Sequence, residues 1–188
     1  MKENKLYEDS IILIGPSGAG KSTIAADMES RMGMPRVCLD KLTSVARKSG
    51  YRAKFKTPDE FNCHMIHTLV EEAKTNAPDT PYVVDFGAGH SIYKDKEMFR
   101  RVKQDLKPFK NVVLLLPCKD EKRALEIMAE RSTGDISENL EFLRNTCNKE
   151  LATMVVYAEG RTPQEITEEI MDRIAKRKEQ DKDTWDFE

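Results

Sequence analysis

The sequence predicts an α/β protein in which a five-stranded parallel sheet lies between two layers of helices. Three observations support this prediction. Short apolar runs alternate with helical stretches, which is the order of a parallel sheet covered on both faces. The runs are nearly continuous in hydrophobicity, as expected for strands buried on both sides. The chain has 188 residues, about one domain's worth, and no internal repeat or linker is visible.

Five apolar runs have the length of strands, and β-branched residues recur in them. They lie at 10–14, 36–39, 82–86, 112–116 and 154–157. Helices are expected at 21–32, from 41, from 57 to about 74, at 94–106, at 119–131, from 137 to about 151 and from 162 to about 175. Two of them have clear start signals, Thr57-Pro58 and Thr162-Pro163, each followed by acidic residues in the first turn.

The C-terminal residues form a charge run, which is typical of a solvated helix end that frays. We therefore expect a single domain over 1–176, followed by a charged tail over 177–188. The sequence leaves open whether Trp185 and Phe187 in this tail dock on the domain or on a partner.

Composition excludes several classes of protein. Lys and Arg number 31 and Asp and Glu 33, and a net charge of −2 argues against a nucleic-acid partner held by bulk positive field. No apolar run approaches the roughly 20 residues that span a bilayer, and the first residues lack the apolar segment of a secretory signal. The four scattered cysteines are expected to be reduced, buried thiols. We expect a cytoplasmic protein without a membrane span, either a monomer or a homodimer.

A phosphate-binding motif follows the first predicted strand, where residues 15–22 match G-x-x-x-x-G-K-[ST] in full. The glycines let the chain curl so that backbone N–H groups face phosphate oxygens, and the next helix adds its positive N-terminal end. Lys21 would place an ammonium on the β- and γ-phosphates, and Ser22 would offer a hydroxyl to Mg²⁺. The motif predicts a P-loop NTPase fold that uses ATP and Mg²⁺. The nucleotide-binding residues expected in it are Gly15, Pro16, Ser17, Gly18, Ala19, Gly20, Lys21, Ser22 and Thr23.

Other motifs narrow the type of P-loop protein. A guanine-reading N-K-x-D fails at 148–151, which ends in Leu151, and a D-x-x-G switch fails at 85–88. No L-S-G-G-Q segment of a transporter ATPase is present. A compact chain of this length fits a small-molecule kinase best.

Several segments in the right order resemble the shikimate kinase-like branch of the nucleoside monophosphate kinase superfamily. They are the phosphate loop at 15–23, a strand at 34–40 that ends in an Asp, the glycine-containing segment 85–90, Arg131 at a helix end, and the loop 157–163. The resemblance extends over about residues 10–174. It implies transfer of the γ-phosphate of ATP to a small-molecule acceptor, with a short helical lid at about 131–147.

Two aspartates follow predicted strands, so both should lie at the carboxyl edge of the sheet, where ligands bind in such folds. Asp40 could accept a hydrogen bond or a proton from the acceptor hydroxyl, or it could cap a helix from Lys41. Asp85 is the natural Walker B-like carboxylate, reaching Mg²⁺ through water, or else a cap for the turn at Gly87. The sequence leaves open which of the two is the base. The catalytic residues expected are Lys21, Asp40, Asp85 and Arg131, and the metal ligands expected are Ser22 and Asp85.

Further residues are expected around the ligands. Arg131 would bring its guanidinium over the phosphates or the adenine when the lid closes, and Arg161 and Pro163 would flank the adenine. The acceptor side is expected to comprise Asp40, Gly87, Gly89, His90 and Lys149. The pair His64 and His67 lacks the partners that a metal site needs.

The acceptor side departs from the pattern of shikimate kinases. The D-x-D of their second strand is here Cys38-Leu39-Asp40, no Arg is evident near Phe61-Asn62-Cys63, and the R-P-L-L segment of the lid is missing. Two alternatives therefore stay open beside a small-molecule kinase. One is a nucleoside monophosphate kinase or a 5′-hydroxyl nucleic-acid kinase, and the other is an ATP-binding regulatory protein or an ATPase without an acceptor.

Overall fold

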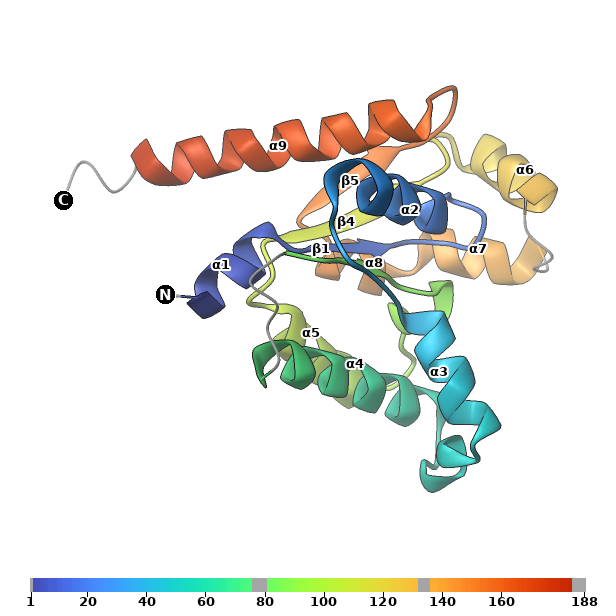
Figure 1. The fold of residues 1–188 in the computed structure, drawn as a ribbon. Coiled ribbons are helices and arrows are strands. Elements are labelled where there is room, and N and C mark those ends of the chain that lie inside the picture. The colour runs from blue at the N-terminus through green and yellow to red at the C-terminus, as the bar shows by residue number, and fades with distance from the viewer. Residues whose placement is uncertain (1, 76–80, 132–135, 184–188) are drawn as a thin grey trace.

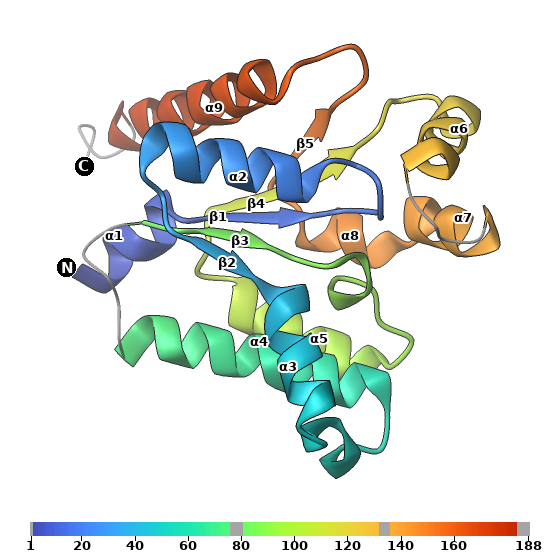
Figure 2. The same cartoon turned by 45° about the vertical axis from the view of Figure 1, so that its right-hand side comes forward.

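The computed structural model of the chain describes residues 2–75, 81–131 and 136–183. A parallel sheet of five strands in the order β2-β3-β1-β4-β5 runs through the molecule, with helices on both sides (Figures 1 and 2). The strands are β1 (Ile11–Ile14), β2 (Arg36–Cys38), β3 (Val83–Asp85), β4 (Asn111–Leu116) and β5 (Met154–Tyr157). The predicted fold class is confirmed, and each predicted strand is present within two residues of its expected ends.

Alternate side chains of the central strand enter two separate cores. Ile12 and Ile14 pack on one side with helices α1, α4, α5 and α8, whereas Ile11 and Leu13 pack on the other side with α2 and α9. These helices are α1 (Lys2–Asp9), α2 (Lys21–Met32), α4 (Pro58–Thr75), α5 (Lys96–Leu106), α8 (Thr146–Leu151) and α9 (Pro163–Asp183). The continuous hydrophobicity of the strands follows from this, since both faces of the sheet are buried.

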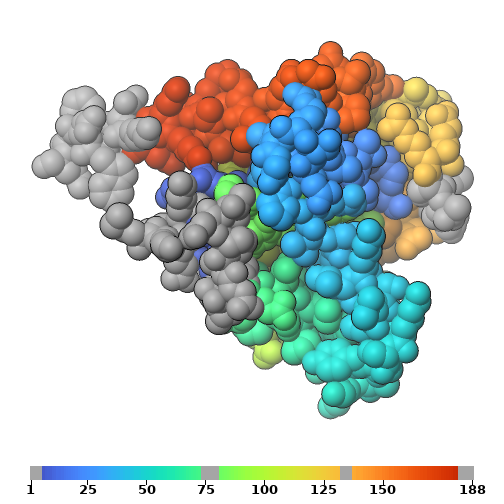
Figure 3. Space-filling model, in the orientation of Figure 1, coloured from blue at the N-terminus to red at the C-terminus, as the bar shows by residue number. Residues whose placement is uncertain are grey.

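The remaining helices lie around the carboxyl ends of the strands. They are α3 (Leu39–Lys48), α6 (Glu121–Arg131), α7 (Ile136–Arg144) and the 3₁₀ turns η1 (Tyr51–Lys54) and η2 (Ala88–His90). α3 and η1 extend away from the body of the molecule (Figures 1 and 3), whereas α6 and α7 pack on each other beyond β4 and β5. The carboxyl edge of the sheet therefore lies between these two groups of helices.

Several helix boundaries differ from those predicted. The helix after β2 begins at Leu39 rather than at 41, so Asp40 lies inside its first turn and is not its N-cap. The helix expected over 137–151 is two helices, because Asn145 interrupts it and accepts a hydrogen bond from the backbone N–H of Cys147 at 2.9 Å. The last helix continues to Asp183 instead of ending near 175. Trp185 and Phe187 lie outside the described residues.

Helix α1 was not predicted. It buries Leu6 and Tyr7, and the ring of Tyr7 meets the ring of Phe109 edge-on at 4.9 Å between centroids. Asp9, the last residue of α1, forms an ion pair with Lys178 of α9. The two ends of the described chain are thus held together.

Other predictions concern the cysteines, histidines and membrane spans. All four cysteines are free thiols, three of them buried and Cys38 half-buried. His64 contacts the hydroxyl of Tyr51 at 2.9 Å and His67 contacts Asp105 at 3.1 Å, and the described residues contain no cluster of three or more metal-ligating side chains. None of the helices described is long and apolar enough to cross a membrane.

Candidate active site

The phosphate loop connects β1 to α2, and its backbone needs glycine. Gly15 has φ 135°, and a Cβ there would lie 2.3 Å from the carbonyl oxygen of Leu115 on β4. Gly18 and Gly20 also have positive φ, 75° and 98°. Only glycine adopts such angles without strain, so the motif is required by the path of the chain itself.

Lys21 begins α2, and its ammonium lies inside the loop. Only 7% of the residue is exposed, and Nζ donates to the carbonyl oxygens of Gly15 and Pro16, both at 2.8 Å. Burial lowers the pKa of Lys21 to about 8, although the negative charges of Asp85 and Asp40 act in the opposite direction. The ammonium is thus a buried cation that faces two carboxylates.

A cavity of about 420 Å³, here named the phosphate-loop pocket, opens beside this loop. The described residues that line it are Ser17, Gly18, Gly20, Lys21, Ser22, Thr23, Asp40, Asp85, Phe86, Ala88 and Arg131. They come from the loop and α2, from the starts of α3 and η2, from the end of β3 and from the end of α6. The structure therefore places Lys21, Asp40, Asp85 and Arg131 around one cavity, as the sequence predicted.

Asp40 and His90 form a contact that depends on Gly87. The Nδ1 atom of His90 lies 3.4 Å from Oδ1 of Asp40, and a Cβ on Gly87 would lie 1.8 Å from the same oxygen. The carboxylate of Asp40 is 64% exposed toward the pocket side, whereas His90 is buried behind it. The close approach predicted at Gly87 is therefore to Asp40 itself.

His90 has no hydrogen-bond partner for either ring nitrogen among the described residues. Burial lowers the pKa of His90, and the charge of Asp40 opposes this shift. The imidazole is buried rather than exposed in the loop, and it is not among the described residues that line the pocket. It faces Asp40, and we infer that it contacts an acceptor only through that carboxylate.

Asp85 ends β3, is almost fully buried, and accepts a hydrogen bond from Nη2 of Arg36 at 2.6 Å. Arg36 is the first residue of β2, and the register of the two strands pairs Arg36 with Val83 and Cys38 with Asp85. Sequence reasoning missed Arg36, although a charged residue inside an apolar strand was a visible signal. It could not be paired with Asp85 before the order of the strands was known.

Several predicted residues are absent from the described lining of this pocket. They include Gly15, Pro16 and Ala19 of the phosphate loop, Gly87 beside Asp40, and four residues on other segments. Arg161 donates to the carbonyl oxygens of Tyr157 and Glu165 and pairs with Glu169, so its guanidinium is engaged by the start of α9. Pro163 opens that helix and is exposed, and Lys149 is an exposed residue of α8. Gly89 is exposed, and its carbonyl accepts a hydrogen bond from the amide of Asn62 at 3.2 Å.

The lid expected at about 131–147 includes residues 132–135, which lie outside the described residues. Arg131 precedes them at the end of α6 and lines the pocket. Helix α7 follows them, and Arg144 at its end makes paired hydrogen bonds to Glu121 of α6 at 3.0 and 2.7 Å. Helices α6 and α7, which precede and follow residues 132–135, are therefore held to each other by this ion pair.

Sequence comparison finds a curated relative that spans nearly the whole chain, although no family model matches the sequence. A shikimate kinase of Enterococcus faecalis is 29% identical over 180 residues, which cover 88% of this chain and 98% of the relative. This chain is therefore similar to a shikimate kinase over most of its length. The predicted resemblance and the predicted class, an ATP-dependent small-molecule kinase, are confirmed by this relative.

Solved structures show the same fold. A shikimate kinase from Acinetobacter baumannii in complex with shikimate matches with a TM-score of 0.62 at 19% identity, covering 93% of this chain and 98% of that one. A gluconokinase from Sinorhizobium meliloti matches with a TM-score of 0.59 at 20% identity, covering 93% and 95%. The fold of these two structures therefore extends over most of this chain.

Proposed function

We propose that this protein transfers the γ-phosphoryl group of ATP to a hydroxyl group of a small polar metabolite bound beside Asp40. The observation that supports the proposal is the phosphate-loop pocket, which brings to a single cavity one buried cation and two carboxylates, one from the start of α3 and one from the end of β3. Phosphoryl transfer needs positioning and neutralisation of charge more than covalent chemistry, and this set of side chains offers both.

Residues 15–23 would bind the phosphates of ATP. In the unliganded chain the ammonium of Lys21 donates to two carbonyls of its own loop, and phosphate oxygens would offer it a stronger, charged acceptor. Arg131 lines the same cavity and would face the transferred group. Both cations would stabilise the negative charge of the transition state.

The oxygen donors in the pocket fit Mg²⁺, which prefers oxygen ligands and keeps several waters. Ser22 offers a hydroxyl, and the buried carboxylate of Asp85 lies in the same lining. These two residues would hold the ion, which neutralises phosphate charge when bound. Arg36 would hold the carboxylate of Asp85 in one orientation, because it donates a hydrogen bond to it at 2.6 Å.

Asp40 is the better placed of the two carboxylates to act as the base. Its side chain is largely exposed at the pocket, whereas Asp85 is buried and paired with Arg36. As the acceptor oxygen forms its bond to the γ-phosphorus, the bond from that phosphorus to the β-γ bridging oxygen breaks and ADP leaves. The proton of the acceptor hydroxyl passes to Asp40.

The acceptor is proposed to differ from shikimate. The residue two positions before Asp40 is Cys38, a half-buried thiol, where shikimate kinases have a second Asp. Asn62 stands in the segment where they place an Arg, and its amide donates to the carbonyl of Gly89. A neutral polyol fits these substitutions better than shikimate, because an amide and a thiol offer no cation to a carboxylate.

The test is ADP formation with Mg-ATP and a panel of acceptors that includes shikimate, gluconate and neutral polyols. A nucleoside monophosphate and a 5′-hydroxyl oligonucleotide serve as the comparison. We expect a neutral polyol to raise turnover well above slow ATP hydrolysis, and to do so more than shikimate or gluconate. If no acceptor in the panel does so, the proposal of an acceptor kinase fails.

Asp40→Asn tests the assignment of the base with the acceptor found in this way. We expect turnover to fall by about 10²-fold or more, the typical contribution of a general base, with little change in ATP affinity. An equal loss of ATP affinity would place Asp40 on the nucleotide instead.

A further inference from the structure

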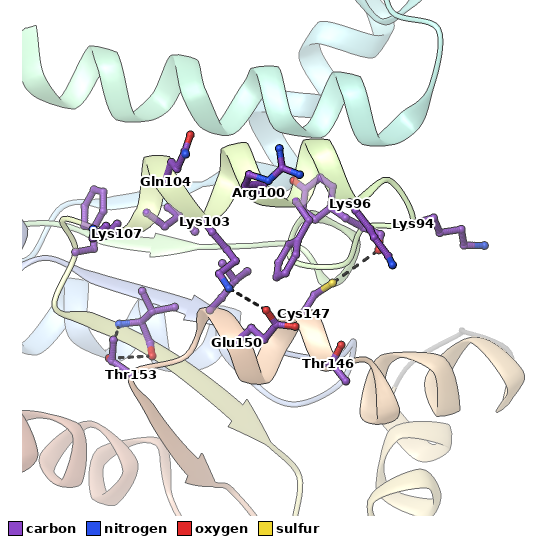
Figure 4. A pocket seen from close by; sticks show the side chains of 16 residues that line it. Lys94, Lys96, Arg100, Lys103, Gln104, Lys107, Thr146, Cys147, Glu150 and Thr153 are labelled. Atoms are coloured by element: carbon purple, nitrogen blue, oxygen red, sulfur yellow. Dashed lines mark hydrogen bonds and ion pairs between the residues drawn. The ribbon is translucent and has the colours of Figure 1, made fainter.

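A second cavity, larger than the phosphate-loop pocket, lies between helices α5 and α8 against strand β4 (Figure 4). Its volume is about 780 Å³, within the range of small-molecule sites, and we name it the α5–α8 cavity. Tyr93 separates it from the acceptor loop, since its ring lines the cavity while its hydroxyl donates to the carbonyl of His90 at 3.0 Å. The two cavities share no described lining residue.

The floor of the α5–α8 cavity is apolar. Leu106, Phe109 and Val112 are almost fully buried there and belong to the core on this side of the sheet. The half-buried ring of Phe99 forms a wall, and the ring of Tyr93 stacks on it at 6.1 Å between centroids. A flat apolar group would find contacts on the floor and on this aromatic wall.

The rim of the cavity is cationic. Five of the described lining residues are basic and one is acidic, although the whole chain has a net charge of −2. The basic residues are Lys94, Lys96, Arg100, Lys103 and Lys107; Figure 4 shows Lys103 next to the acidic residue, Glu150, and the other four spread along the cavity on both sides of it. This concentration of charge creates a local positive potential over an apolar surface.

Two of these cations have no ionic partner among the residues that the structure describes. Lys103 pairs with Glu150 at 2.9 Å, and Arg100 pairs with Glu97 of its own helix. Lys96 and Lys107 make no ion pair and no side-chain hydrogen bond with any described part of the chain. Their ammonium groups are therefore available to an anion at the rim.

We propose that the α5–α8 cavity binds a small organic anion, a molecule with a flat apolar body and a carboxylate, at a site separate from the phosphate-loop pocket. The apolar body contacts Phe99 and the buried floor, while the carboxylate lies near Lys96 or Lys107. The apolar floor alone would not bind the carboxylate, and the cationic rim alone would not bind the apolar body. This site does not depend on which acceptor the kinase uses.

Three probes separate the contributions of charge and apolar contact. 2-Naphthoate has both features, 2-naphthamide keeps the ring without the charge, and inorganic phosphate has charge without the ring. Binding is followed by calorimetry and by amide chemical shifts of the ¹⁵N-labelled protein. We expect naphthoate to bind more tightly than either of the others, to shift amides of α5 and α8, and to lose affinity as salt is raised.

Lys96→Gln and Lys107→Gln test the rim, with Lys122→Gln as a matched control on the exposed face of α6. Each rim variant is expected to weaken naphthoate binding by about two- to fivefold, the usual effect of one exposed charge contact, and the control should leave it unchanged. Naphthoate binding that equals naphthamide binding, that is absent, or that falls equally in the control would overturn the proposal. So would shifts confined to the amides of residues 15–23.

Discussion

Gly87 is the residue at which one methyl group would most disturb the acceptor side of the pocket. Its φ of −62° suits any residue, so alanine would fit the backbone, but its Cβ would lie 1.8 Å from Oδ1 of Asp40. The carboxylate must then rotate away from His90. We expect Gly87→Ala to lower turnover by about 10²-fold, since it removes a positioned base, while the KM for ATP stays within about twofold.

Gly89 provides the matched control two residues along the same turn. No atom lies within 4 Å of a Cβ built there, and its φ is not in the left-handed region. Gly89→Ala should therefore retain nearly full turnover in the same steady-state assay. Equal losses in the two variants would show that the loop, and not the position of Asp40, limits the reaction.

Lys21 should make ATP binding depend on pH. Its pKa of about 8 in the unliganded chain means that the amine loses its proton as the pH rises through 8, whereas bound phosphates favour the ammonium. We expect ATP affinity to fall as the pH rises above 8, by up to about tenfold per pH unit. Calorimetry in buffers of different ionisation enthalpy measures the proton uptake directly.

Lys21→Met is the control for this titration, because it keeps the apolar stem and removes the ammonium. It should abolish turnover, leave the circular dichroism spectrum of the fold unchanged, and remove the proton uptake. Full activity in this variant would refute the assignment of the phosphate loop.

At the scale of elements, β2 and β3 are joined by an ion pair between Arg36, the first residue of β2, and Asp85, the last residue of β3. Arg36 and Asp85 have side-chain exposures of only 19% and 3%, so removal of one partner leaves the other charged and poorly solvated. We expect Arg36→Met to lower the free energy of unfolding by about 3–5 kcal/mol in urea titrations. The double variant with Asp85→Leu should recover part of this loss, and strictly additive effects would contradict the coupling.

Helix boundaries show why local patterns predicted some elements and not others. Two helices begin as expected because their start signals are local. Pro58 opens α4, and α9 begins with a reciprocal cap in which the side chains of Thr162 and Glu165 accept hydrogen bonds from each other's backbone N–H groups. The break at Asn145 also has a local cause, but the sequence around it resembles one continuous helix. Only the structure shows that the side chain of Asn145 caps a new helix. Helix α1 was unpredictable because its apolar residues are few and are buried only by partners distant in sequence.

At the scale of the whole molecule, strand order decides which predicted residues meet. The order β2-β3-β1-β4-β5 places the ends of β1, β2 and β3 side by side, so that Lys21, Asp40 and Asp85 share a pocket. Their positions at strand ends were predictable from the sequence. The contacts of Arg36 with Asp85 and of His90 with Asp40 were not predictable, because each joins segments about 50 residues apart. The first depends on the register of β2 and β3, and the second on the absence of a side chain at Gly87.

The free energy of unfolding of the whole molecule should depend on pH below neutrality, because His90 is buried. Burial is the main cause that lowers the pKa of this imidazole; the charges of Arg47 and Lys21 act in the same direction, and the charge of Asp40 opposes them. Between the unfolded pKa of about 6.5 and the lower folded value, the unfolded chain binds a proton that the folded chain does not. The free energy of unfolding should therefore fall as the pH drops below about 6.5, by about 1.4 kcal/mol for each unit by which the pKa is lowered. Urea titrations from pH 7.5 to 5 should show a shallower decline for His90→Gln than for the unsubstituted chain. The same slope in both proteins would mean that His90 takes up its proton equally in the folded and unfolded states, and the imidazole would then be accessible to water rather than enclosed behind Asp40.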